Sequence, residues 1–173
     1  MMFHVKHTTK TLFKRGFLLF FMLAFATSCI TQRRTVEITD YILLNNGKEI
    51  LGKEQGLTAF MFENNPRNIP FQQFLADKYN VGSYRDVSYW VTVEGSRYKV
   101  FLYENAEVEK YFDTSEYIVT NAETDANIRG SMAKFICLSM INESNDDCLA
   151  DDSLFQNIAV NYLKRLKDEY LNN

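Results

Sequence analysis

The sequence has little histidine, proline and cysteine, and the shortage of histidine limits its chemistry most. Both histidines, His4 and His7, lie in the first seven residues, so residues 29–173 contain no imidazole. A Ser-His-Asp or Cys-His catalytic site and a histidine-ligated zinc site are therefore excluded from that part of the chain. The GxxxxGK[ST], GxGxxG, GxSxG and CxxC motifs are absent as well. The chemistry that remains is that of carboxylates, tyrosine and lysine.

Basic side chains are also scarce outside the first segment. Four of the 19 basic residues lie in residues 1–28, which contain no acid, so residues 29–173 carry 15 basic against 22 acidic residues, a net charge of −7. An acidic chain without a basic stripe repels phosphate, so we expect no nucleic-acid partner.

The longest apolar run is too short to cross a membrane. Residues 17–26 (FLLFFMLAFA) are all apolar and follow a basic segment, whereas a membrane-spanning helix needs about 20 apolar residues. A basic segment followed by a short apolar run is typical of a secretory signal peptide. We therefore predict that residues 1–28 are a signal peptide.

The four residues after this run indicate how the signal ends. Ala26-Thr27-Ser28-Cys29 resembles the lipobox of bacterial lipoproteins. The resemblance implies that Cys29 is diacylated and becomes the new N-terminus, with residues 29–35 as a lipidated tether to the membrane. Cleavage after Ala26 of the A-x-A sequence 24–26 is the alternative, and it would release a soluble protein.

The residues after Cys29 indicate which membrane the lipid would anchor the protein to. Ile30 stands where an aspartate signals inner-membrane retention in lipoproteins of the enterobacterial kind, so the resemblance implies the outer membrane. Residues 31–34 are basic rather than acidic, unlike the surface-export signal of the Bacteroidota kind. We expect a lipid-anchored protein on the periplasmic side.

Residues 36–173 predict a single α+β domain, because no proline- or glycine-rich linker interrupts them. A mainly antiparallel sheet is expected, with a C-terminal amphipathic helix from Ser153 to about Leu171 and one or two further helices. Ser153 and Gln156 have the spacing of a capping box. Expected strands lie at 35–44, 57–62, 88–93, 98–103, 117–120 and 135–141, and expected helices at 70–79 and 106–112.

The two remaining cysteines, Cys137 and Cys148, are candidates for a disulfide. In an oxidising periplasm this bond would tie the start of the terminal helix to the sheet. Two buried free thiols are the alternative, because cysteine is among the most often buried residues.

Aromatic residues gather in the predicted hairpin and form the candidate partner or ligand surface. Strand alternation places large apolar groups on both faces. Either helices cover both faces, or one face presents aromatics to a glycan, peptide or protein partner. The candidate residues are Tyr89, Trp90, Tyr98 and Tyr103.

Carboxylates offer the one enzymatic alternative, a hydrolase acting on envelope glycans through paired acids. Its candidates are Glu104, Glu107, Glu109 and Glu116. A second acidic group lacks the spacing of a calcium-binding loop; it comprises Asp146, Asp147, Asp151 and Asp152. We assign no catalytic residue, metal ligand or cofactor, and predict a lipid-anchored, non-enzymatic binding or structural module of the cell envelope.

Overall fold

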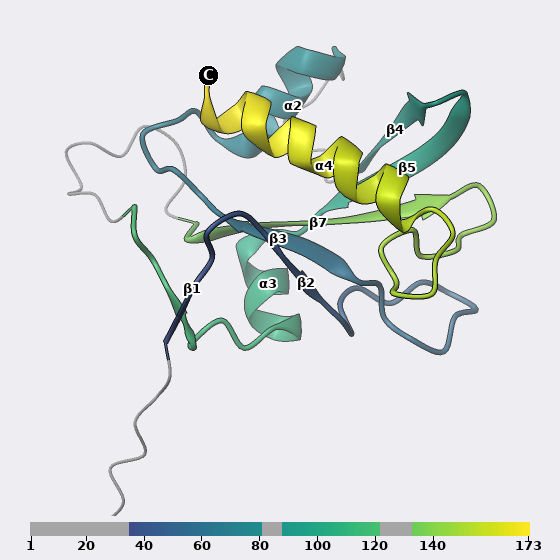
Figure 1. Cartoon of the computed structure of the whole chain (residues 1–173), viewed down its shortest axis with the longest axis horizontal. Coiled ribbons are helices and arrows are strands. Elements are labelled where there is room, and N and C mark those ends of the chain that lie inside the picture. The colour runs from purple at the N-terminus through teal and green to yellow at the C-terminus, as the bar shows by residue number, and fades with distance from the viewer. Residues whose placement is uncertain (1–34, 81–87, 122–132) are drawn as a thin grey trace, which may run out of the picture. The chain divides into compact units, whose positions relative to one another are not determined.

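A five-stranded sheet forms the centre of the structure, a computed structural model that describes residues 35–80, 88–121 and 133–173 (Figure 1). Every neighbouring pair of its strands is antiparallel. The strands in spatial order are β2 (Ile42–Leu44), β3 (Ala59–Glu63), β7 (Phe135–Asn142), β5 (Ser96–Leu102) and β4 (Ser88–Val93). A separate parallel pair joins β1 (Val36–Glu37) to β6 (Tyr117–Ile118).

Two helices cover one face of the sheet and a third lies on the other face, as Figure 1 shows. These helices are α2 (Phe71–Tyr79), α4 (Gln156–Leu171) and α3 (Asn105–Tyr111). The predicted α+β fold, with a mainly antiparallel sheet and a C-terminal helix, is confirmed. Residues Thr35–Asn173 form one compact unit.

The larger core lies between the sheet and the pair α2 and α4. Phe71 is fully buried and makes edge contacts with Tyr170, at 4.8 Å between ring centroids, and with Phe62, at 5.9 Å. Alternate residues of β4, β5 and β7 point into this core because successive strand residues face opposite sides. Burial of these large side chains is the main stabilising contribution, at about 25 cal/mol per Å² of apolar area.

The smaller core lies on the opposite face and covers only part of it. Val108 and Phe112 of the α3 region pack with Met61 of β3 and Cys137 of β7. The outward residues of β4 are Ser88, Trp90 and Thr92, and none of them belongs to this core. Among the described residues, the helices therefore cover the first face of the hairpin and no helix covers the second face of β4.

The hairpin between β4 and β5 turns through two residues, not the four expected. Glu94 and Gly95 both have positive φ, 52° and 82°, the sign pattern of a type I′ turn, whose twist suits paired strands. The strand β5 consequently begins at Ser96, and the register places Trp90 directly opposite Lys99.

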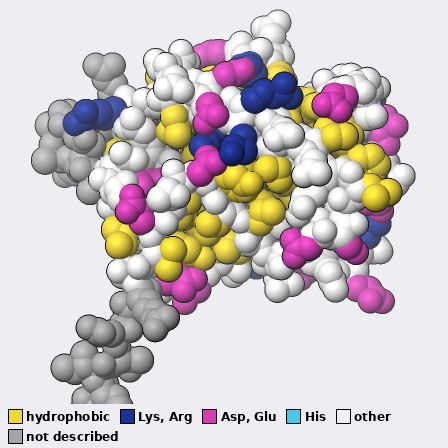
Figure 2. All heavy atoms as spheres, in the orientation of Figure 1, with side chains coloured by type: hydrophobic (Ala, Val, Ile, Leu, Met, Phe, Trp, Pro, Cys, Tyr) yellow, Lys and Arg dark blue, Asp and Glu magenta, His cyan; other side chains and the backbone are white. Residues whose placement is uncertain are grey.

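The expected strand at 35–44 is split between the two sheets, with Asp40 at the bend. Asp40 makes ion pairs with Lys164, at 2.8 Å, and with the largely buried Lys167, both from α4. On the face in Figure 2, basic and acidic side chains likewise lie next to one another. These ion pairs fix the first described residues to the terminal helix.

The terminal helix begins at Gln156, three residues later than expected. The Ser153 hydroxyl accepts a hydrogen bond from the Phe155 backbone N–H at 3.3 Å, while the Gln156 side chain donates to the Leu149 carbonyl. Because the Gln156 amide bonds to this earlier carbonyl, the reciprocal capping box does not form. A capping box does form at α3, between Glu104 and Glu107.

The predicted disulfide is not formed, and this expectation is corrected. Cys137 and Cys148 are both free and fully buried. Cys137 belongs to the smaller core, whereas Cys148 packs in the larger core on the opposite side of the sheet. The backbone of β7 therefore separates the two side chains, although Cys148 N–H donates to the Met140 carbonyl of that strand.

Thiol alkylation checks this arrangement. Burial raises the pKa of the Cys137 thiol and, together with Asp147 and Asp146, that of Cys148. Since the thiolate is the reactive form, both are expected to resist alkylation in folded protein that carries Cys29→Ala. In denaturant without reductant, two alkyl groups should be added by intact mass, and a mass showing none would establish a disulfide.

Candidate functional site

The structure separates the four candidate aromatic residues of the hairpin. Tyr89, Tyr98 and Tyr103 are buried, each residue being at most 5% exposed, whereas Trp90 is 44% exposed. Prediction of the three tyrosines as ligand-contacting residues is therefore wrong. They face the two cores, and only Trp90 faces solvent.

Trp90 lies under two cations on the open face of the hairpin. The Arg97 guanidinium is 4.5 Å from the Trp90 ring centroid, and the Lys99 ammonium is 5.9 Å from it. Lys99 also lies 5.1 Å from the ring centroid of Phe101. We call the four residues Trp90, Arg97, Lys99 and Phe101 the Trp90 surface.

The two cations of the Trp90 surface have no acidic partner among the described residues. Other lysines do: Lys48 pairs with Glu107 at 2.7 Å and Lys53 with Asp146 at 2.8 Å. On a protein with more acidic than basic residues, a basic side chain readily finds a carboxylate partner. Arg97 and Lys99 instead lie over aromatic rings. Within the described residues, Arg97 and Lys99 thus differ from Lys48 and Lys53 in contacting aromatic rings and no carboxylate.

The strand below this surface is fixed by a group of tyrosine hydroxyls. Tyr79 and Tyr89 stack at 4.7 Å between ring centroids, and the Tyr162 hydroxyl lies 2.5 Å from that of Tyr79 and 3.4 Å from that of Tyr89. Burial raises the pKa of all three phenols. The three phenols stay neutral, and their contacts connect β4 to α2 and α4. Tyr89, the neighbour of Trp90 in β4, is thereby fixed on the face of the strand opposite to Trp90.

Sequence reasoning missed Arg97 and Lys99 as partners of Trp90. The alternation within each strand correctly predicted which residues share a face. Which residues of β4 and β5 lie opposite each other depends on the register between the two strands. The signal that gives the register is Glu94-Gly95, a two-residue turn flanked by alternating apolar residues.

Two of the four candidate carboxylates are used in the capping and ion pairing of α3. The side chains of Glu104 and Glu107 form its capping box, and Glu107 also pairs with Lys48. Partial burial raises the pKa of Glu107, but the Lys48 hydrogen bond and charge outweigh this and hold it below its usual value. A general acid in glycoside hydrolysis needs the opposite shift.

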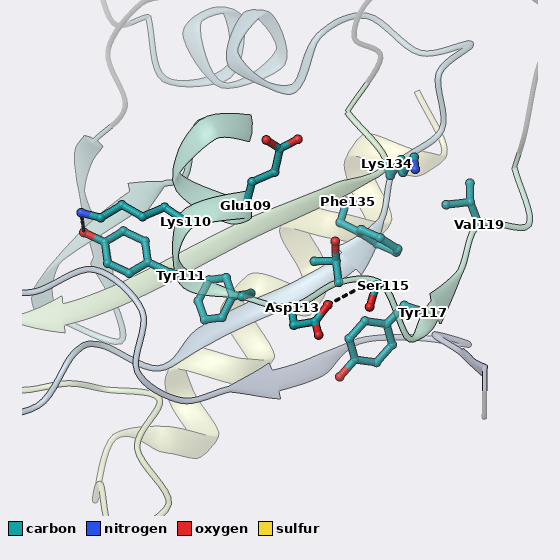
Figure 3. Close-up of a pocket in the computed structure, with 11 residues that line it drawn as sticks. Glu109, Lys110, Tyr111, Asp113, Ser115, Tyr117, Val119, Lys134 and Phe135 are labelled. Carbon is teal, nitrogen blue, oxygen red and sulfur yellow. Dashed lines mark hydrogen bonds between the residues drawn. The ribbon is translucent and has the colours of Figure 1, made fainter. Parts of the chain in front are cut away.

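A third candidate, Glu109, lines an open hollow of about 640 Å³ between α3 and the start of β7 (Figure 3). Asp113 lines the same hollow, and its Oδ1 accepts a hydrogen bond from the Ser115 backbone N–H at 3.0 Å. Figure 3 shows the two carboxylates pointing apart. Glu116 is exposed and does not line this hollow. These positions give no facing pair for hydrolysis.

The second acidic group mainly holds loops together. Asp147 accepts hydrogen bonds from the backbone N–H of Thr58, at 2.6 Å, and of Leu149, at 2.8 Å. Asp146 pairs with Lys53, and Asp151 accepts from Gln156. Within the described residues no group of three acidic, cysteine or histidine side chains is placed to hold a metal ion.

The predicted lipidation site, Cys29, lies outside the described residues. Within residues 35–80, 88–121 and 133–173, no helix is both long and apolar enough to span a bilayer. Comparison with family models, curated proteins and solved structures finds no match to this chain.

Proposed function

We propose that this protein is a lipid-anchored, non-enzymatic binding module of the bacterial cell envelope, which contacts its partner through the Trp90 surface. The observation that carries the proposal is the exposed Trp90 ring beneath two cations that have no acidic partner in the described chain. Aromatic and arginine side chains are enriched where proteins bind partners, since they combine large contact area with directional polar groups.

The proposed anchor is Cys29, by its resemblance to the lipoprotein lipobox. Val36 belongs to β1 and Asp40 is paired with α4, so the chain enters the folded unit within a few residues of the lipid. Seven residues reach at most about 25 Å when fully extended. The domain would thus stay close to the membrane, with a protein or glycan partner of the periplasm within reach.

The test of the anchor compares two cysteine variants of the full chain. Expressed with its own leader in a diderm bacterium and fed a radiolabelled palmitate, the wild type is expected to carry label in the envelope fraction. Cys29→Ala should lose the label, whereas Cys148→Ala, which keeps Cys29, should retain it. Equal labelling of Cys29→Ala and wild type would reject the lipid anchor.

A further inference from the structure

The ligand of the Trp90 surface can be specified from its charge. Arg97 and Lys99 add two positive charges to one open strand face of a chain whose residues 29–173 carry −7. No described acid pairs with either side chain, and neither makes a hydrogen bond within the described part. A ligand that carries negative charge would supply an ion-pair partner for both Arg97 and Lys99.

The stacking of Arg97 restricts the geometry of that anion. Its guanidinium lies over the Trp90 ring at 4.5 Å from the centroid, so the ring limits its orientations. A guanidinium stacked on an aromatic ring still presents its N–H groups at the edge, where they match the two oxygens of a carboxylate. Because the stacked guanidinium is already oriented, the Arg97 side chain loses less conformational entropy when an anion binds.

The surface is elongated along one strand. Arg97, Lys99 and Phe101 are alternate residues of β5 on the same face, and Trp90 lies opposite Lys99. Three alternate strand residues span about 13 Å. A row of two cations with aromatic rings beside them fits an extended ligand that has flat apolar faces and repeated acidic groups.

Resting on the proposed function, we infer that the Trp90 surface binds a carboxylate-bearing glycan. The sugar rings lie against Phe101 and the exposed part of Trp90 that Arg97 does not cover, and the carboxylates accept hydrogen bonds from Arg97 and Lys99. Trp and Phe supply apolar contact area and Arg supplies the directional charge contact.

An anionic lipid surface fits the geometry less well. Binding to a bilayer interface buries aromatic and leucine side chains among the lipids, but the Trp90 ring is overlain by Arg97 and is only 44% exposed. The highly exposed leucines of the described residues lie elsewhere, at Leu51 and Leu154 on loops outside this strand face.

The test uses calorimetric titration of the domain (residues 30–173) with three probes. They are an oligogalacturonate, the same oligosaccharide with its carboxylates methyl-esterified, and phosphatidylglycerol vesicles. Only the oligogalacturonate is expected to bind, and its affinity should fall as salt rises because the charges are solvent-accessible. Arg97→Gln and Trp90→Leu should each weaken binding about tenfold, while Arg97→Lys should weaken it less.

Arg165→Gln is the matched control, since it removes one exposed arginine from α4 instead of β5. Its affinity should equal that of the wild type, and all variants should keep the wild-type melting temperature. Equal binding of acid and ester, an equal loss in Arg165→Gln, binding to vesicles alone, or no binding to the oligogalacturonate would each overturn the inference. Each of these results would reject the acidic glycan as the ligand. The proposed function would still stand or fall on a separate measurement, the detection of a partner at the Trp90 surface in cells.

Discussion

Replacing Tyr98 by alanine is expected to destabilise the domain by about 3–5 kcal/mol, the range for removing a large aromatic side chain from a core. Tyr98 is 1% exposed and makes an edge contact with Phe155 at 6.1 Å between ring centroids. The cavity left behind would lie between β5 and the start of α4. Urea unfolding followed by circular dichroism measures the change.

Trp90→Ala is the matched comparison, because both residues lie on the same hairpin and were both candidates for ligand contact. Trp90 belongs to neither core, and its ring lies against Arg97 and Lys99, so its loss should cost less than about 1 kcal/mol, as for other surface substitutions. A similar loss of unfolding free energy in the two variants would show that Trp90 is a core residue. The Trp90 surface could then not be a binding surface.

Gly47→Ala is expected to cost about 3 kcal/mol, the upper part of the range for overpacking a filled core. A β-carbon at this position would lie 2.4 Å from the Tyr103 hydroxyl oxygen, 2.7 Å from the Leu57 carbonyl oxygen and 2.9 Å from Phe112 Cζ. The hydroxyl cannot move away freely, because it accepts a hydrogen bond from Lys48 N–H and is bonded to the Ser139 hydroxyl. Displacing it would also break buried hydrogen bonds.

The control for Gly47→Ala is Gly52→Asn. A β-carbon at Gly52 meets nothing within 4 Å, and asparagine tolerates the positive φ of 86° found there. Its unfolding free energy should stay within about 1 kcal/mol of wild type. If Gly47→Ala proved equally mild, the loop around Gly47 would not pack against Tyr103 as the structure has it.

The sequence predicted the elements better than their contacts. Short apolar runs predicted β3 and β7, alternation and a turn signal predicted the hairpin, and Pro70 preceded α2 as expected, because these signals are local. The split strand and the shifted helix start depend on particular side-chain contacts that local patterns do not reveal. Asp40 bends the first segment toward lysines more than 120 residues away, and Gln156 bonds to Leu149 in place of a capping box.

The candidate site was predictable only in part for the same reason. Composition placed aromatics in the hairpin, but burial of Tyr89 and Tyr103 depends on α4 and α3, which cover different faces of the sheet. The cysteine pair failed in the same way, since eleven residues of separation do not reveal that the sheet lies between them. Arg97 and Lys99 emerged only from the strand register.

The central claim is that the Trp90 surface contacts an envelope partner while Cys29 holds the protein at the membrane. Photo-crosslinking in intact cells tests it, with a benzophenone amino acid placed at Thr92, which is exposed on the same face as Trp90, or at Leu154, which is 94% exposed on a loop before α4. We expect an adduct with an envelope component from Thr92 alone, lost when Arg97→Gln or Cys29→Ala is added. No adduct from Thr92, or the same adduct from Leu154, would contradict the claim.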